Sequence, residues 1–435
     1  MITVARPISA RMVLAVTAVA SVATLGLTAP ATASINQPTV TSEVPSTKTP
    51  HAVNDDVVAN AAVHSFSQVG SVMYAGGQFH SIQDPARTTT STRHNLFSFD
   101  VATGQPTSWA PKVDGMVFRT LYVAPYLYVG GSFTSADGVA GRLVRYRVDS
   151  GTPVIDTAWR AERVSAPVTD LDYTGGRLIV AGSFKKRLVA LDPATGRDTG
   201  YLRLDIAGTV KTNGAGPTAV YRIAISPDGS RLVAIGNFAT VGTVSRPRAF
   251  MADLGTDSAS LSAWSYRPLK NVCRATSLSA YLRDVDFSPD GSYFVFVATG
   301  GMPTTANGVG RDLCDATARF ETRIATPLRP SWINYTGGDT LHSVAAVGSA
   351  VYVGGHQRWL DNPEGRNSAG PGAVPRPGIG AIDPVSGKAL AWNPTKSRGV
   401  GAKFIYPTAA GVWFGSDGRR FAGRVHDSIA FTPST

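Results

Sequence analysis

The chain is poor in several residue types, and each shortage excludes a class of protein. Only 2 of its 435 residues are cysteine, which excludes a small scaffold held by many disulfides and a cysteine-rich zinc cluster. The 7 histidines are scattered, without the spacing of a metal site. There is no Gly-x-Gly-x-x-Gly or phosphate-loop motif, no Gly-x-Ser-x-Gly elbow and no dense run of aspartates. We therefore expect no metal and no cofactor.

Glutamate is also scarce, and charged residues make up only 16% of the chain. After residue 33, glutamate occurs only at Glu43, Glu162, Glu321 and Glu364. Glycoside hydrolysis needs two carboxylates, but two aspartates that are distant in the sequence can also meet in a fold. Carbohydrate hydrolysis is therefore disfavoured and not excluded. The net charge of +11 favours anionic partners, although solubility alone can account for it.

What the chain does contain is a repeated motif. Its clearest copy is Leu-Tyr-Val-Gly-Gly-Ser-Phe at residues 127–133, and eroded copies return about every 50 to 60 residues. Other copies lie at residues 73–79, 178–184, 232–238 and 351–355. A period of this length with strand-like content indicates a repeat architecture. The adjacent glycines suggest a bend or a close approach of the backbone.

One full unit, residues 117–164, contains four strand-like segments. They lie at residues 117–123, 126–133, 142–148 and 158–160. Four short strands of this kind form one blade of a β-propeller. An aromatic residue recurs at the fourth segment of most units, as Trp109, Trp159, Tyr201, Trp264, Trp332 and Trp392. We expect this residue to pack between neighbouring blades.

Counting the first strands gives seven units, with six or eight as alternatives because two units are eroded. The last unit has no recognisable fourth strand. Residues 49–55 resemble residues 110–115, which end a unit, so they can supply the missing strand. The sequence therefore predicts an all-β chain with a single β-propeller over residues 49–435. We expect seven four-stranded blades, closed by an N-terminal strand that pairs with the C-terminal blade.

The first residues predict export. Arg6 and Arg11 precede an apolar run, and Ala31-Thr32-Ala33 fits a signal-peptide cleavage site. We therefore assign residues 1–33 to a signal peptide and residues 34–48 to a flexible lead-in. The apolar run is short for a membrane span, and no later run is long enough. The expected product is a secreted, extracellular protein, and we expect a monomer.

The motif residues carry a family resemblance. The stretch Tyr128-Val-Gly-Gly-Ser-Phe-Thr134, with Trp109-Ala-Pro111 and Trp392-Asn-Pro394, resembles the delta-sixty repeat of secreted actinobacterial β-propellers. It is distantly similar to TolB-like and WD-type propellers. The resemblance covers residues 49–435 and implies a secreted or surface binding scaffold. It offers no catalytic residues to carry over, because the repeat residues of that family are structural.

The two cysteines, Cys273 and Cys314, are expected to form a disulfide. Cys273 precedes the first strand of the fifth unit, and Cys314 follows the second strand of that unit. In a blade, these two loops emerge on the same face. An exported chain also meets an oxidising compartment, which favours the bond. The alternative is two free thiols, and nothing marks either of them as a nucleophile.

The starts of the predicted inner strands carry polar side chains that should ring the mouth of a central channel. The candidate ligand-binding residues are His64, Arg119, Arg222, Arg283, His342 and Lys403. We expect this mostly basic ring to bind anions, with the histidines giving pH dependence near neutrality. In the alternative interpretation, the cations pair with Asp170 and Asp284 and merely solvate the channel.

These observations predict a secreted binding module rather than an enzyme, although catalysis stays open. The expected partner is an anionic cell-envelope polymer or a surface protein, and no nucleic acid is indicated. The alternative is a secreted carbohydrate-active hydrolase or lyase with its site at the channel mouth. That enzyme requires two carboxylates, or a carboxylate and a histidine, within reach of one substrate bond. A purely structural envelope protein is a third interpretation.

Overall fold

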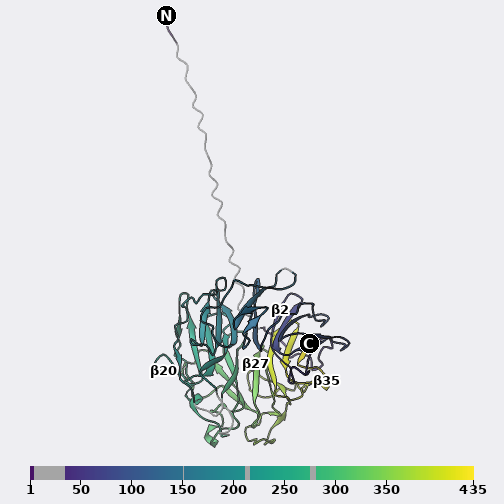
Figure 1. Cartoon of the computed structure of the whole chain (residues 1–435). Coiled ribbons are helices and arrows are strands. Elements are labelled where there is room, and N and C mark those ends of the chain that lie inside the picture. Colours follow the sequence, from purple (N-terminus) through teal and green to yellow (C-terminus); the bar gives the residue numbers. More distant parts are fainter. Residues whose placement is uncertain (4–34, 150, 211–215, 275–280) are drawn as a thin grey trace.

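The strand-like segments of the repeat fold as many small antiparallel sheets, so the prediction of an all-β chain is confirmed (Figure 1). The computed structural model describes residues 1–3, 35–149, 151–210, 216–274 and 281–435. Within these ranges the only helices are two short 3-10 segments, η1 (Arg267–Lys270) and η2 (Ala306–Gly308). No helix in the described ranges is both long enough and apolar enough to span a bilayer. The predicted signal peptide lies almost entirely outside these ranges.

Seven sheets carry the long strands, and in each the second strand lies between the first and the third. The first strands are β2 (Ala62–Val69), β7 (Val117–Val123), β13 (Val168–Thr174), β17 (Ala219–Ile225), β23 (Leu282–Phe287), β27 (Leu341–Ala346) and β32 (Ala402–Thr408). The second strands are β3 (Val72–Gln78), β8 (Tyr126–Gly131), β14 (Arg177–Gly182), β18 (Arg231–Asn237), β24 (Tyr293–Ala298), β28 (Val351–Gly355) and β33 (Gly411–Ser416). The third strands are β6 (Leu96–Asp100), β11 (Leu143–Arg147), β15 (Leu188–Leu191), β21 (Ala249–Leu254), β25 (Ala316–Glu321), β31 (Ile379–Ile382) and β36 (Ile429–Pro433).

A fourth strand completes three of these sheets. These strands are β12 (Val154–Ile155), β22 (Ala259–Leu261) and β26 (Trp332–Tyr335). In three other sheets a single bridge stands in the fourth position: Phe99 with Pro106, Leu191 with Asp198, and Ile382 with Ala389. The fourth strand of the second sheet begins earlier than residues 158–160, where we predicted it. The reason is that the carboxylate of Asp156 accepts hydrogen bonds from the backbone N–H groups of Ala158 and Trp159, which turns the chain out of the sheet.

Short hairpins lie between the second and third strands of five sheets. They are β4 (Ser81–Gln83) with β5 (Thr90–Thr92), β9 (Ser135–Ala136) with β10 (Val139–Ala140), β19 (Thr240–Val241) with β20 (Val244–Ser245), β29 (Trp359–Leu360) with β30 (Val374–Pro375), and β34 (Arg420–Phe421) with β35 (Arg424–Val425). Two further strands, β1 (His51–Val53) and β16 (Ile206–Ala207), pair with β4 and β19 respectively.

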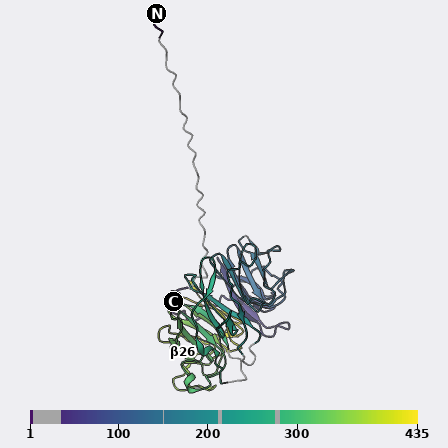
Figure 2. The ribbon, with the colours of Figure 1, turned by 90° about the vertical axis from the view of Figure 1, so that its left-hand side faces the viewer.

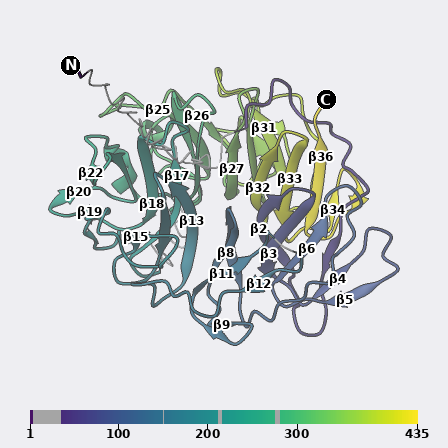
Figure 3. The same ribbon diagram turned by 90° about the horizontal axis from the view of Figure 1, so that it is seen from above.

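The first strands contact one another in chain order, and β32 also contacts β2. Figure 3 shows β13 and β17 on one side of the body, and β2 and β32 on the other. Figure 2 shows the sheets gathered into the same body from a view at right angles to Figure 1.

The segment that we expected to act as the closing strand, residues 49–55, lies between the last sheet and the first. Its strand β1 pairs with β4, in the hairpin that follows β3, and the N–H of Ala52 donates to the carbonyl of Asp427, just before β36. Residues 110–115 are placed in the same way: Val113 bridges to the hairpin of the next sheet, and Lys112 bridges to the chain just before β6. The resemblance between the two segments is therefore real, and each segment contacts the sheet before it and the sheet after it.

Residues 35–48, expected as a flexible lead-in, make the backbone contacts to β36 itself. The N–H groups of Ser42 and Ser46 donate to the carbonyls of Pro433 and Phe431, on β36. Further upstream, Gln37 is buried and bridges in parallel to Gly348. The chain therefore lies against β36 one segment earlier than the sequence predicts.

The hydrophobic core consists of clusters between adjacent sheets. Trp109 illustrates the packing: its ring lies 5.5 Å from that of Tyr74 in the first sheet and 5.2 Å from that of Tyr146 in the second. The repeated aromatic therefore packs between neighbouring sheets, as predicted.

The predicted disulfide between Cys273 and Cys314 is present, with 5.8 Å between the two Cα atoms. Both cysteines are buried. The bond closes a loop with a sequence separation of 41 residues. A loop of this length corresponds to about 3–4 kcal/mol of stabilisation in the chain-entropy description.

Candidate functional site

Each of the seven first strands contains one β-bulge, at the same position near its start. A bulge places one extra residue in a strand and redirects its side chain, and bulges are common next to functional sites. The seven bulge residues are His64, Phe118, Thr169, Tyr221, Arg283, His342 and Lys403.

A glycine faces the bulged strand in five of the seven sheets. In the second sheet, a Cβ on Gly131 would overlap the carbonyl oxygen of Met116, two residues before the bulge. Gly77 and Gly355 face the equivalent carbonyls in their own sheets, so the close backbone approach that the motif predicts is confirmed there. In the fifth and seventh sheets, Ala298 and Ser416 stand at the same place.

The bulge side chains line one cavity of about 390 Å³, which we call the mouth cavity. Its remaining lining comes from Gly216, Pro217, Arg222, Tyr281 and Leu282. Five of the six predicted ligand-binding residues therefore line one space: His64, Arg222, Arg283, His342 and Lys403. Arg119 is not among them, because its guanidinium is paired with the buried Asp170.

Two cations of the mouth cavity, Arg283 and Lys403, form no ion pair with a carboxylate among the described residues. Arg283 donates to the hydroxyl of Tyr281 and, over 2.6 Å, to Nδ1 of His342. Lys403 makes neither a hydrogen bond nor an ion pair with any residue that the structure describes. Burial lowers the pKa of Lys403 to about 8, with Asp417 opposing and Arg283 reinforcing the shift. The ammonium group is therefore charged at neutral pH and loses its proton in mildly alkaline solution.

The two histidines of the mouth cavity are uncharged at neutral pH. Burial and the nearby cations, Lys403 first, lower the pKa of His64 to about 3. Burial and Arg283 lower the pKa of His342 well below its usual value. The expectation that these histidines give pH dependence near neutrality is wrong, because burial and neighbouring positive charge both disfavour the imidazolium form.

A layer of ion pairs lies beneath the mouth cavity, on the next residue of each strand. Nε of Arg119 lies 2.5 Å from Oδ1 of Asp170, a fully buried carboxylate. The Arg119 guanidinium also lies 4.4 Å from the ring centroid of Phe404. We call Arg119, Asp170, Arg222, Asp284 and Phe404 the ion-pair layer.

Arg222 belongs to both the mouth cavity and the ion-pair layer. Its Nη1 donates to the carbonyl of Thr169 over 2.6 Å, and its Nε lies 3.8 Å from Oδ1 of Asp284. The alternative interpretation, in which the cations pair with aspartates, is therefore correct for Arg119 and Arg222. Burial raises the pKa of Asp284 to about 6 although both arginines act against the shift.

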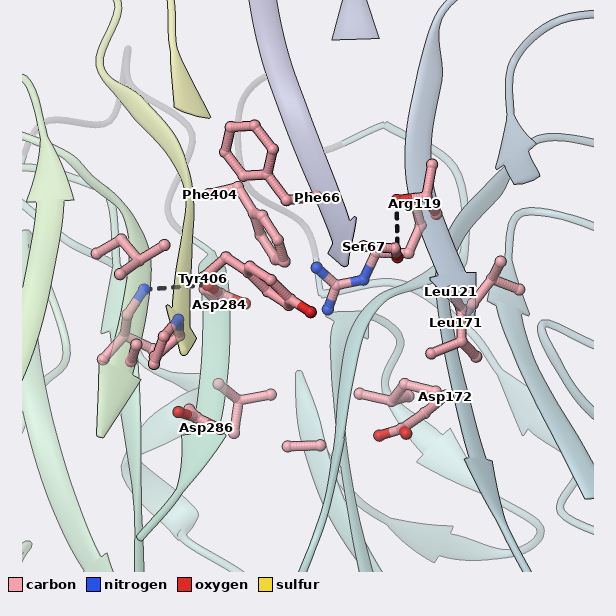
Figure 4. A pocket seen from close by; sticks show the side chains of 18 of the residues that line it. Phe66, Ser67, Arg119, Leu121, Leu171, Asp172, Asp284, Asp286, Phe404 and Tyr406 are labelled. Carbon is pink, nitrogen blue, oxygen red and sulfur yellow. Dashed lines mark hydrogen bonds between the residues drawn. The ribbon is translucent and has the colours of Figure 1, made fainter. Parts of the chain in front are cut away.

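A second cavity of about 310 Å³ lies on the other side of the ion-pair layer, and we call it the lower cavity (Figure 4). Its walls are mainly aliphatic, with Asp172, Asp286 and Tyr406 among the polar groups. Burial raises the pKa of Asp286 to about 7, and its Oδ2 accepts a hydrogen bond from the N–H of Ala346 over 2.8 Å.

Among the described residues, no group of three or more His, Cys, Asp or Glu side chains is placed to hold a metal ion. The carboxylates that we considered for catalysis, Asp170 and Asp284, do not line the mouth cavity. Its lining among the described residues is instead basic and aromatic.

Sequence reasoning missed the aromatic part of the mouth cavity. Phe118 and Tyr221 precede the predicted Arg119 and Arg222, and it is the earlier member of each pair that occupies the bulge. Part of the signal was present in the repeat, because the second glycine of the motif faces the carbonyl two residues before the displaced residue. Counting from that glycine, rather than choosing the charged residue, identifies the bulge in five sheets, whereas the fifth and seventh sheets have Ala298 and Ser416 at that place.

Comparison with known proteins identifies no family for this chain and one structural similarity. No protein-family model matches the chain. No curated protein matches it either. Among solved structures, the chain is similar to the computationally designed Ika8 protein, with a TM-score of 0.46 and 12% sequence identity over 86% of this chain and 96% of that one.

Proposed function

We propose that residues 49–435 form a single seven-bladed β-propeller, with the seven long-stranded sheets as its blades. Contacts of β32 and β33 with β2 support ring closure. So does Gly415, which lies against Val63 of β2 just as Gly130 lies against Val168 of the next sheet. The hydrogen bonds from Ser42 and Ser46 to β36 fill the fourth position of the last blade, so closure involves residues upstream of the propeller as we bounded it. The resemblance to delta-sixty propellers agrees with this arrangement.

We infer that the protein is a binding module that takes an anionic ligand in the mouth cavity. The observation that carries this inference is the presence of two cations, Arg283 and Lys403, that face one cavity without a carboxylate partner among the described residues. Unpaired, partly buried cations are costly, and an anion relieves that cost through charge-assisted hydrogen bonds. The expected partner is an anionic cell-envelope polymer or a surface protein, bound by a monomer.

We infer that the chain is exported and extracellular. The signal-peptide pattern of residues 1–33 supports export, and a buried disulfide suits an oxidising compartment. A binding module for envelope polymers requires this location.

The alternative function is a carbohydrate-active lyase or hydrolase at the same cavity. A hydrolase is disfavoured because no carboxylate lines the mouth cavity in the described part of the chain. A lyase is the stronger alternative, since the uncharged His64 and His342 lie beside cations that can neutralise a uronate. A turnover assay that follows the absorbance of unsaturated uronate products separates catalysis from binding.

The test of binding uses the purified chain from Ser34 onward, at low and high salt. The probes are polygalacturonate, poly(glycerol phosphate) and neutral dextran. We expect binding to an anionic probe at low salt, no binding to dextran, and release by salt. The variants Arg283→Gln and Lys403→Gln should each lose affinity, whereas Lys388→Gln, which removes the same charge from an exposed turn, should not. Equal binding by all three variants would refute the proposed site.

A further inference from the structure

The seven bulge residues divide the mouth cavity into two arcs. From the fifth sheet round to the first, the consecutive residues are Arg283, His342, Lys403 and His64. From the second sheet to the fourth they are Phe118, Thr169 and Tyr221. Among these bulge residues, the first arc carries the cations and the second carries no charge. Arg222 lines the cavity on the second side as well, but it belongs to the ion-pair layer, where it lies beside Asp284. The bulge residues on that side are therefore neutral and largely aromatic.

The neutral arc extends beyond the bulge residues. The ring of Tyr281 lies 5.6 Å from that of Tyr221, edge to face, and both rings line the cavity. Opposite charge and hydrogen bonds select an anionic group, whereas an exposed aromatic face selects an apolar or ring-shaped group. The two arcs therefore fit a ligand that carries an anionic group on one edge of a ring.

The ion-pair layer closes the cavity from below. Arg119 extends from the second sheet to Phe404 of the seventh, and its guanidinium is paired with Asp170. Arg222 bridges from the fourth sheet to the carbonyl of Thr169 on the third. Arg222 lines the mouth cavity, whereas Arg119 and Asp284 line the lower cavity, so the layer separates two spaces. A polymer chain cannot pass through the channel without breaking these pairs.

The size of the mouth cavity limits the ligand further. Its volume of about 390 Å³ is near the small end of the range for ligand pockets, about 300–1,000 Å³. That space holds one or two sugar rings, and a closed floor gives the bound segment no second exit. We propose that the mouth cavity recognises the end of an acidic saccharide chain. The anionic group of the terminal sugar lies at Arg283 and Lys403, and its ring lies against Tyr221 and Tyr281. This inference rests on the proposed function and specifies its ligand.

His342 positions Arg283 for this ligand. Its Nδ1 accepts a hydrogen bond from Arg283 over 2.6 Å, which holds the guanidinium at the cavity. Nε2 of His342 is itself buried and has no hydrogen-bond partner in the part of the chain that the structure describes, so His342 acts on the ligand through Arg283.

The experiment compares chain lengths of one acidic saccharide. Galacturonate oligomers of about five and about fifty residues each carry one end of a given kind, while the longer chain offers roughly tenfold more internal positions. We expect the dissociation constant per chain, measured by calorimetry, to be the same for both lengths. A dissociation constant that falls about tenfold for the longer chain overturns recognition of the end.

Two further probes test the arcs separately. Poly(glycerol phosphate) offers anions without rings, and we expect it to bind at least about tenfold more weakly than the galacturonate oligomer. Tyr221→Leu and Tyr281→Leu should each weaken oligomer binding severalfold and leave poly(glycerol phosphate) unaffected. Equal affinity for both probes, unchanged by these variants, overturns the role of the aromatic arc.

The outcomes distinguish this inference from the proposed function. If Arg283→Gln and Lys403→Gln abolish binding while affinity grows with chain length, the cavity binds anions but not chain ends. If neither substitution weakens binding of any anionic probe, the proposed function itself fails. Folding of each variant is checked by its thermal unfolding midpoint, and Lys388→Gln serves as the control for loss of charge.

Discussion

Nη2 of Arg283 lies 2.6 Å from Nδ1 of His342, so a permanent cation donates a hydrogen bond to an uncharged imidazole. This contact explains why histidine is not the titrating group of the mouth cavity. Protonating His342 would place a second positive charge against the first and remove the acceptor. Among the residues that line the mouth cavity, the group that changes charge closest to physiological pH is Lys403, whose pKa is lowered to about 8.

We predict that anion affinity decreases as the pH rises through about 8. Below this pH, Lys403 is protonated and attracts the anion; above it, the ammonium loses its proton and the attraction is lost. Arg283 and Asp417 also act on Lys403, and His64 and His342 are uncharged throughout. Calorimetric affinity for an acidic oligosaccharide between pH 6.5 and 9.5 measures the effect.

The conservative variant Lys403→Arg tests the assignment, because arginine stays charged over the whole range. It should abolish the decrease in affinity near pH 8, whereas His64→Gln should leave the decrease in place. A decrease that persists in Lys403→Arg would assign the titration to another group.

The fold was predictable because repetition amplifies a weak signal. A single Gly-Gly-x-Phe segment is ambiguous, but its return with the flanking aromatic residue fixed the strand order and the packing of Trp109 between sheets. The disulfide followed from the same order of loops. The pairing of residues 49–55 could not be predicted in full. This segment looks like residues 110–115, and both segments contact two sheets, so similarity alone does not say with which sheet each one pairs.

The charged residues of the candidate site were predictable from the sequence, and its aromatic residues were not. The starts of the strands were located correctly. At two of them, however, the prediction selected the charged residues Arg119 and Arg222 rather than the neighbouring Phe118 and Tyr221. A bulge shifts the alternation of side chains by one residue, and strand periodicity does not register such a shift. The pKa values of His64 and His342 depend on burial and on cations that are distant in the sequence, so no local pattern could reveal them.

We predict that the segment before β1 stabilises the fold. The hydroxyl groups of Thr41 and Thr432 lie 2.8 Å apart and are buried, and the backbone N–H of Thr41 donates to the hydroxyl of Tyr352 over 2.9 Å. Thr41→Val leaves the Thr432 hydroxyl without this partner, which should lower the free energy of unfolding by about 1–3 kcal/mol. Urea denaturation measures the loss.

The exposed Thr39→Val, two residues earlier, is the matched control and should change stability by less than about 0.5 kcal/mol. A flexible lead-in would make both substitutions neutral. That result would also remove the support that Ser42 and Ser46 give to ring closure.

We predict that Gly131, the second glycine of the motif in the second sheet, cannot be replaced without a loss of stability. A Cβ on Gly131 would overlap the carbonyl oxygen of Met116, so Gly131→Ala must displace the bulged strand. The expected loss is about 3 kcal/mol, at the upper end of the cost of overpacking. Because the bulge aims Phe118 into the mouth cavity, ligand affinity should fall as well. Gly138→Ala is the control: Gly138 has a φ of +79° but open space around it, so alanine should cost only about 1 kcal/mol and leave affinity unchanged.

The last prediction concerns the lower cavity, where Asp286 shares the space with Asp172, Asp284, Arg119 and Tyr406. Burial raises the pKa of Asp286 from its usual 3.8 to about 7. Between these two pH values the folded chain keeps a proton that the unfolded chain releases, so this group makes the fold less stable as the pH rises from 3.8 to 7. Asp286→Asn cannot ionise and keeps an oxygen that can accept from Ala346.

The variant should therefore gain stability relative to the native chain at pH 8, and little or none at pH 4. Urea denaturation at both pH values measures the difference. Asp228→Asn is a control of opposite sign, since hydrogen bonds from Ser226 and Ser230 hold the pKa of Asp228 below its usual value. That variant should lose stability at pH 8 and lose less at low pH. Equal effects of Asp286→Asn at the two pH values would mean that folding does not raise the pKa of Asp286.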